Sequence, residues 1–330
     1  MAISGCQGRP NDEARGEQAV RFSNSEALHA SWGWLRKSIG IVLLLAAAGT
    51  VPASGEEIKA NQLFGAKELP TMSKPMVIGG YAKGCLSGAV QLPESGPTWQ
   101  AMRLSRNRHW GHPILIDYLI DLSERARDLG WKGLYIGDLN QPRGGPMTSG
   151  HASHQSGLDA DIWLMPPPSL ELSVAEREEI SAVSVRTADQ AGLNDKWTDT
   201  HMQVLKAAAD NPLVDRIFVT APIKLEMCKT AGEDRAWLQR IRPYYGHHYH
   251  FHVRLKCPPE SETCITQTPT VAELSNGGDG CDKSLEWWVT AYLDSLKKPP
   301  PDPPPPRPRG ARDYVMADLP EQCQQVLNAP

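Results

Sequence analysis

The sequence of 330 residues contains no C-x-x-C pair, no H-E-x-x-H motif and no basic patch with interleaved aromatic residues. Acidic and basic residues are mixed along a chain of formal net charge −4, which argues against nucleic acid as the main partner. The missing C-x-x-C spacing argues against a zinc ribbon. The missing H-E-x-x-H motif excludes the peptidases that carry two zinc ligands and a glutamate base on one helix.

No long apolar run suited to a membrane span is present either, because the apolar stretch at residues 39–48 is short. It follows the basic pair Arg36-Lys37 and precedes small residues at positions 53–55. This order predicts a signal peptide over residues 1–55 with an extended, polar n-region. Two alternatives are an uncleaved N-terminal anchor and, for the long n-region, an upstream choice of start codon.

Six of the seven cysteines follow the predicted signal. An even number in an exported chain predicts three disulfides. Cys257 and Cys264 enclose a short loop and form the expected local pair. Cys323 lies beyond a polyproline stretch at residues 297–310, and we expect it to tie this tail back to the body, with Cys85 as its preferred partner.

Separated helices and alternating strands indicate the α+β class, with a small antiparallel sheet flanked by helices and disulfide-tied loops. Residues 58–97 are rich in Gly, Pro and Ser, and we expect an extended segment with little regular structure there. The periodicity predicts helices near residues 113–129, 173–180, 199–209, 222–227, 235–241 and 285–296, and strands near residues 134–137, 158–164, 214–219 and 248–255.

Residues 150–163 hold two histidines and two aspartates and organise the chemistry. Alternation places Asp159, Asp161 and Trp163 on one face of a strand, and His154 lies in the small-residue loop before it. A neutral imidazole and a carboxylate on rigid backbone are two of the ligands that a catalytic zinc ion uses.

The strand at residues 248–255 supplies the missing ligand, because alternation places His248, His250 and His252 on one face. His252 completes a two-histidine, one-carboxylate set, so Asp161 and His252 must lie on facing or adjacent strands. Such a set leaves an open position where bound water has its pKa lowered toward neutrality. His250 is the candidate base, and His247 is a second catalytic candidate that would polarise the tetrahedral intermediate.

These motifs carry a family resemblance. The pattern S-H-x-x-G-x-x-x-D at residues 153–161, with H-x-H at residues 250–252, resembles the zinc peptidases grouped with lysostaphin and the D-Ala-D-Ala carboxypeptidases. More narrowly, the segments GHASHQSGLDADIW, VDRIFVTAPIK and HHYHFHVRLKC resemble the penicillin-insensitive murein endopeptidases.

The resemblance implies hydrolysis of the D-alanyl–meso-diaminopimelyl cross-link of peptidoglycan in a Gram-negative periplasm. It implies zinc held by His154, Asp161 and His252, with His250 as the catalytic histidine. From the composition we expect a zinc peptidase domain at residues 56–297 and a proline-rich tail at residues 298–330, without stable membrane insertion once the signal is removed. The implied disulfides are Cys85–Cys323, Cys228–Cys281 and Cys257–Cys264.

His151 matches a further metal ligand of the family, which can hold a second metal through this histidine with an aspartate and a histidine from the segment between the two motifs. The matching positions here are Ala188 and Ala191, and no histidine occurs from residue 162 to 200. We therefore expect no complete second site, and His151 either binds metal or hydrogen-bonds substrate.

Several residues keep two interpretations. Asp159 either orients a ligand histidine or caps the loop, and His112 either lines the cleft or caps a helix. Arg103 and Arg254 either bind a substrate carboxylate or form structural salt bridges. Two rival functions also stand: a D,D- or L,D-carboxypeptidase on stem peptides, and a non-catalytic, zinc-stabilised wall-binding module.

Overall fold

The computed structural model describes residues 57–299, 301–304 and 306–330, so the predicted signal peptide lies outside the described residues. Contacts along the chain divide it between Glu57 and Ile58, and residues 58–330 form one unit. Among the described helices, none combines the length and the apolar character that crossing a membrane requires.

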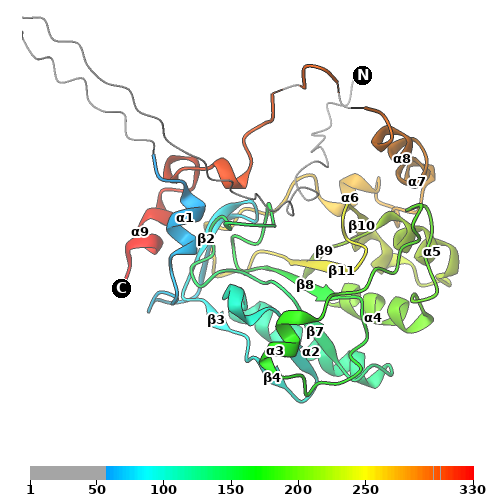
Figure 1. Cartoon of the computed structure of the whole chain (residues 1–330), viewed down its shortest axis with the longest axis horizontal. Helices are drawn as coiled ribbons and strands as arrows, with labels where there is room; N and C mark the ends of the chain where they lie inside the picture. Colours follow the sequence, from blue (N-terminus) through cyan, green and yellow to red (C-terminus); the bar gives the residue numbers. More distant parts are fainter. Residues whose placement is uncertain (1–56, 300, 305) are drawn as a thin grey trace, which may run out of the picture. The chain divides into compact units, whose positions relative to one another are not determined.

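The predicted α+β class is confirmed, because helices surround a seven-stranded sheet at the centre of this unit (Figure 1). Across the sheet the order is β10 (Ile241–Pro243), β9 (Val214–Val219), β11 (His250–Leu255), β8 (Asp159–Trp163), β7 (Leu134–Ile136), β5 (Trp99–Ala101) and β4 (Ser95–Gly96).

The expectation of a small, antiparallel sheet holds only in its middle. Strand β11 pairs antiparallel with both β8 and β9, and β8 pairs antiparallel with β7. Toward the edges, β10 pairs parallel with β9 and β5 pairs parallel with β7, so the sheet is mixed. Strands β4, β5 and β10 were not predicted, because two or three residues are too short to show alternation, whereas the equally short β7 stood out as an apolar run.

The two faces of the sheet differ in character. On one face, Ile162 and Val253 lie in the main hydrophobic core with residues of α2 (Pro113–Asp128) and α4 (Asp199–Asp210). Figure 1 shows both helices on the same side of the sheet. On the other face, Asp161 lies directly opposite His252 in the register of β8 and β11. One face is therefore packed by helices, and the other face carries the polar centre.

The remaining helices partly follow the sequence predictions. Ser173 and Glu176 form the predicted capping box, and the segment at residues 235–241 folds as a 3-10 helix (Ala236–Arg240) rather than an α-helix. The predicted helix at residues 285–296 is broken at Thr290, whose backbone angles of φ −126° and ψ −95° are not helical. Further α-helices are α3 (Val174–Glu179), α5 (Ala221–Thr230), α6 (Val271–Leu274), α7 (Glu286–Val289) and α8 (Ala291–Leu296).

Regular structure does occur within residues 58–97, so the expectation of an irregular segment is wrong. Helix α1 (Ala60–Gly65) precedes an antiparallel hairpin of β1 (Met76–Gly80) and β2 (Lys83–Ser87). Glycines hide this hairpin in the sequence; at Gly79 (φ +75°), a Cβ atom would lie 2.5 Å from the carbonyl oxygen of Lys83. A short ladder between β3 (Val90–Gln91) and β6 (Trp110–Gly111) follows.

The two ends of the described chain meet at this hairpin. Helix α9 (Gln322–Asn328) lies beside α1 in Figure 1, and Phe64, Ile78 and Leu327 share a second hydrophobic core. The Cys85–Cys323 disulfide joins α9 to β2, as predicted for the tail. The other two predicted disulfides, Cys228–Cys281 and Cys257–Cys264, are confirmed as well.

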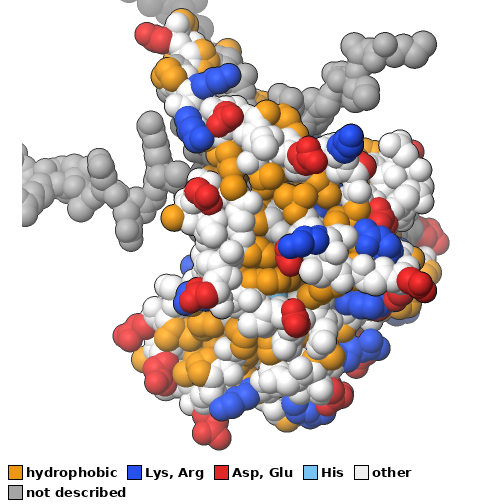
Figure 2. All heavy atoms as spheres, turned by 90° about the vertical axis from the view of Figure 1, so that its right-hand side faces the viewer, with side chains coloured by type: hydrophobic (Ala, Val, Ile, Leu, Met, Phe, Trp, Pro, Cys, Tyr) orange, Lys and Arg blue, Asp and Glu red, His pale blue; other side chains and the backbone are white. Residues whose placement is uncertain are grey.

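Figure 2 shows the face of the molecule that lies on the right in Figure 1. Lys and Arg side chains are interspersed there with Asp and Glu, and apolar side chains lie between them. Neither sign of charge covers this face, in keeping with the near-balanced composition of 34 basic and 38 acidic residues.

Candidate metal centre

Asp161 on β8 is the centre of a cluster of imidazoles. Its Oδ1 atom lies 3.3 Å from Nε2 of His154, 3.5 Å from Nε2 of His250 and 3.5 Å from Nδ1 of His252. Its Oδ2 atom lies 3.6 Å from Nδ1 of His151. Of the six site residues predicted from the sequence, four therefore surround the carboxylate of a fifth.

His247, the sixth of these residues, lies beside the cluster. Its ring centroid is 4.9 Å from that of His250 and 5.7 Å from that of His252. Its Nδ1–H donates to the carbonyl oxygen of Tyr245 at 2.8 Å, which leaves the lone pair on Nε2. Burial, together with the neighbouring histidines, holds the pKa of His247 well below its ordinary value, so the ring is neutral near pH 7.

His248 does not share the face of His250 and His252, so this part of the prediction is wrong. Strand β11 begins only at His250, because a turn precedes it in which the His248 amide donates to the carbonyl oxygen of Gly246. The Nδ1 atom of His248 lies 2.9 Å from the hydroxyl of Ser184, outside the cluster. Alternation in the sequence suggested a longer strand than the turn allows.

The loop histidine His154 is fixed by its backbone and by its ring. Its amide donates to Oδ2 of Asp159 at 2.9 Å, and its Nδ1–H donates to the carbonyl oxygen of Leu139 at 2.6 Å. The residue has φ +62°, a left-handed conformation that costs a non-glycine residue on the order of 1–3 kcal/mol. These contacts hold the Nε2 lone pair of the fully buried ring toward Asp161.

Asp159 holds the strand side of the centre. Its carboxylate accepts two hydrogen bonds from the guanidinium of Arg254, at 2.8 and 3.0 Å, and its Oδ1 lies 3.1 Å from Nε2 of His252. Burial opposes ionisation, but Arg254 holds the pKa of Asp159 well below its usual range. Asp159 thus contacts a predicted ligand histidine, as one of its two interpretations required. Arg254 forms a buried structural salt bridge rather than an open carboxylate-binding group.

Asp138, in the loop after β7, belongs to the site but was not predicted from the sequence. Its Oδ2 is 3.0 Å from Nε2 of His151 and 2.9 Å from Nη1 of Arg108, and Arg106 approaches to 3.1 Å. Burial opposes ionisation here too, but His151 and the two arginines hold the pKa of Asp138 below its usual range. The only signal in the sequence was an acidic residue directly after a short apolar strand.

The donor atoms fit a metal ion. His151, His154 and Asp161 each offer a ligand atom, and these atoms lie within 4.8 Å of one another. Within the described part of the chain, Nε2 of His154 and Oδ1 of Asp161, which face each other, are buried without a hydrogen bond of adequate geometry. Unsatisfied buried groups are costly, and an ion is one of the causes that explain them.

The protonation states of the histidines and of Asp161 also bear on metal binding. Burial lowers the pKa of His250, and it lowers the pKa of His252 to about 4, so both rings are neutral near pH 7. Burial would raise the pKa of Asp161, but the positive charge that His250, His154 and His151 carry when protonated holds it well below its usual range. Neutral imidazoles and an ionised carboxylate are the donor forms that zinc takes, so His154, whose pKa Asp161 raises against the effect of burial, would give up a proton on binding the ion.

Other candidates from the sequence have structural roles. His112 caps α2, because its Nδ1 accepts from the amide of Ile114. The guanidinium of Arg103 lies 5.9 Å from the ring centroid of Trp163, which is buried against Tyr135.

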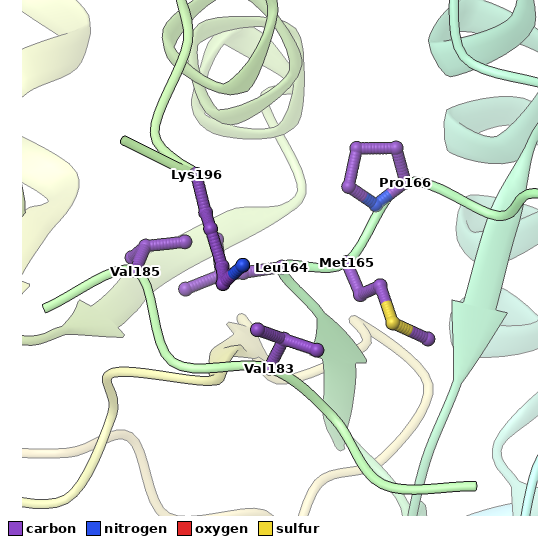
Figure 3. Close-up of a pocket in the computed structure, with 6 residues that line it drawn as sticks. All are labelled: Leu164, Met165, Pro166, Val183, Val185 and Lys196. Carbon is purple, nitrogen blue, oxygen red and sulfur yellow. The ribbon is translucent and has the colours of Figure 1, made fainter. Parts of the chain in front are cut away.

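A separate pocket of about 190 Å³ lies where β8 ends (Figure 3). It is lined by Leu164, Met165, Pro166, Val183, Val185 and Lys196. Leu164 and Val185 donate their amides to the carbonyl oxygens of Tyr249 and His248, so the pocket flanks the segment that leads into β11. None of its lining side chains is a carboxylate, an imidazole or a thiol, which leaves the chemistry to the cluster around Asp161.

The fold and the cluster together define a class: an α+β protein with a candidate metal centre of the kind that hydrolases use.

Comparison with known proteins makes this specific, because residues 77–328 match the family described as penicillin-insensitive murein endopeptidase. The proteins of that name from Haemophilus influenzae and Yersinia enterocolitica are 40% and 38% identical over 257 and 264 residues, covering 78% of this chain and 84% and 88% of theirs. The one from Klebsiella pneumoniae is 34% identical over 294 residues, 88% of this chain and 97% of its own. The chain belongs to the penicillin-insensitive murein endopeptidase family, and the resemblance seen in its motifs is confirmed.

Proposed function

We propose that this chain is an exported, zinc-dependent murein endopeptidase that hydrolyses the D-alanyl–meso-diaminopimelyl amide cross-link of peptidoglycan. Membership of the family supports the peptidase activity and the murein substrate. The observation that carries the zinc dependence is the pair of buried, unsatisfied donor atoms Nε2 of His154 and Oδ1 of Asp161, with Nδ1 of His252 at 3.5 Å from the same carboxylate oxygen. Two imidazoles and one carboxylate are a common donor set of catalytic zinc.

In this proposal His154, Asp161 and His252 hold the zinc ion, and His151 is a further donor on the loop side. The ion would supply Lewis-acid polarisation of the scissile carbonyl and activation of a water molecule. The chain itself prepares the site by keeping His252 neutral and by turning nitrogens of His154 and His252 toward Asp161.

His250 is the proposed general base and acid. Its Nε2 lies 3.5 Å from Asp161, and its lowered pKa leaves the ring free to accept a proton from water and return it to the leaving amine. His247 packs against His250 and is the second proposed catalytic residue: its Nε2, uncommitted by the hydrogen bond at Nδ1, would polarise the tetrahedral intermediate only after taking up the proton that the attacking water releases.

Export is supported by the cysteines. Three disulfides are typical of proteins that mature in an oxidising compartment such as the bacterial periplasm. We propose that residues 1–55 act as the signal and that the mature enzyme works on the wall from the periplasmic side. N-terminal sequencing of the secreted protein tests this, since a mature chain that still begins at Met1 would contradict it.

The activity is tested with purified cross-linked muropeptide dimers, analysed by mass spectrometry. We expect the zinc-loaded enzyme to yield monomers, and we expect a chelator to abolish the activity until zinc is restored. Release of free alanine with the cross-link intact would instead identify a carboxypeptidase. Bound zinc without any hydrolysis would identify a non-catalytic wall-binding module.

The ligand set is tested by His154→Ala and His252→Ala. Each variant should lose stoichiometric zinc and with it the release of monomers from sacculi. His248→Ala is the matched control, because His248 lies in the same histidine-rich segment but faces Ser184 instead of Asp161. Full activity in either ligand variant would overturn the proposed centre.

A further inference from the structure

Asp138 lies behind His151 in a network that takes no part in the chemistry proposed above. The carboxylate side chain is only 4% exposed, and Arg108, which contacts it, is 8% exposed. Arg108 also donates to the hydroxyl of Ser149 at 2.9 Å, and Arg106 reaches the same carboxylate from the half-exposed side. Asp138 is thus a buried anion with two guanidinium partners and one imidazole partner.

These contacts fix which nitrogen of His151 carries the proton. A carboxylate held ionised by two arginines can only accept hydrogen bonds, so the contact of 3.0 Å requires a proton on Nε2 of His151. In a neutral imidazole the lone pair is then on Nδ1. That nitrogen is the one that faces Oδ2 of Asp161 at 3.6 Å.

His151 needs such a partner because, apart from its polar contacts, it is held in the described part of the structure only by packing against the ring of His154, whose centroid is 4.2 Å away. It lies in a loop after Gly150 (φ +70°), outside any strand, and its side chain is 20% exposed. The polar contacts of His151 lead to Asp138 on one side and to Asp161 on the other.

We propose that Asp138, held by Arg108 and Arg106, is a positioning residue that turns Nδ1 of His151 toward Asp161 and thereby makes His151 a donor of the same metal centre. This inference rests on the proposed function, since it takes a zinc ion at that centre as given. It assigns His151 to the first metal rather than to a second one. It also assigns the network of Asp138 and its arginines a role in metal affinity.

The first test is a double-mutant cycle on zinc affinity, measured by competition with a chromophoric chelator. Asp138→Asn keeps the size of the side chain but offers an amide N–H, which favours the wrong tautomer of His151. We expect Asp138→Asn and His151→Ala each to weaken zinc binding by about 10- to 100-fold, the range known for residues that orient ligands. The double variant should bind zinc as His151→Ala alone does.

Asp189→Asn is the matched control, because Asp189 only closes a local turn with Thr187 and Ala191. Its zinc affinity should equal that of the natural protein. Unchanged affinity in Asp138→Asn, or losses that add up in the double variant, would overturn the proposal.

A second measurement needs no variant and so does not depend on one that folds. In metal-free protein labelled with nitrogen-15 in histidine, nuclear magnetic resonance reports the tautomer of each ring. We expect the proton of His151 on Nε2, and a proton on Nδ1 would overturn the inference. Failure of the natural protein to bind zinc or to cleave murein would contradict the proposed function instead, while the tautomer of His151 still tests the role of Asp138.

Discussion

The centre has two sides that hold their histidines by different means. On the strand side, His252 is fixed by β11, which is hydrogen-bonded on both edges, to β8 and to β9. On the loop side, His151 has no ladder and is fixed by a side-chain hydrogen bond to Asp138. Both supporting carboxylates are paired with arginine, yet only the contact at His151 has the geometry of a hydrogen bond.

This difference indicates different tasks for the two carboxylates. Backbone pairing already orients His252, so Asp159 contributes chiefly by neutralising buried Arg254 and by holding the strained loop at His154. No backbone pairing orients His151, so its direction depends on Asp138. The same type of contact therefore stabilises the fold on one side and positions a donor on the other.

The largest expected effect separates chemistry from metal binding. His250→Ala should lower kcat by about 10²- to 10⁴-fold, the range for loss of a general acid–base group, while zinc stays bound. His151→Ala should instead act through zinc affinity, so saturating zinc should restore much of its rate. Steady-state kinetics on muropeptide dimers at low and at saturating zinc distinguish the two. If saturating zinc also restored His250→Ala, His250 would be a ligand and not the base.

The second effect concerns stability. Asp159→Asn should lower the free energy of unfolding by about 3–5 kcal/mol, because it leaves the buried charge of Arg254 without its partner. Asp138→Asn should cost less, about 1–3 kcal/mol, because one of its two arginine partners, Arg106, is half exposed and can be hydrated. Urea unfolding of both metal-free variants measures the difference. Equal losses would remove the distinction drawn between the two sides.

The strand side was predictable from sequence and the loop side was not, for a physical reason. A period of two residues is enough to place Asp159 with Asp161, and His250 with His252, on shared strand faces. The expectation that Asp161 and His252 lie on facing or adjacent strands is confirmed by their direct pairing. Loops carry no such period, so nothing marked Asp138 as a partner of His151.

The same limit explains the errors elsewhere in the fold. The hairpin of β1 and β2 depends on glycine conformations and on a disulfide to Cys323, which lies 238 residues from Cys85. His248 was placed on the wrong face because a turn, set by backbone hydrogen bonds, shortens the strand. The hairpin depends on contacts between distant segments, and the position of His248 depends on backbone hydrogen bonds. The alternation of residue types along the sequence predicts neither.

The smallest expected effect concerns the pH dependence of stability at Lys224. Both sides of the metal centre pair a buried charge with an opposite one, and Lys224 lacks such a partner among the described residues. Lys224 is fully buried, but its Nζ donates only to the carbonyl oxygens of Leu238 and Asp279, and the described residues include no carboxylate in salt-bridge contact with it. Burial, reinforced by Arg242, lowers the pKa of Lys224 from 10.5 to about 7. The unfolded chain therefore binds more protons than the fold between these two values.

Stability should accordingly rise with pH from about 7 toward 10, with a slope of at most about 1.4 kcal/mol per pH unit from this residue. Below pH 7 both states are charged, and its contribution becomes constant. Urea unfolding of the natural protein and of Lys224→Met at pH 7, 8 and 9 isolates this effect, since the variant should lack the rise. Parallel pH dependence in the two proteins would mean that Lys224 keeps its charge in the fold, and that a buried cation is tolerated here with carbonyl oxygens alone, unlike Arg108 and Arg254 beside the centre.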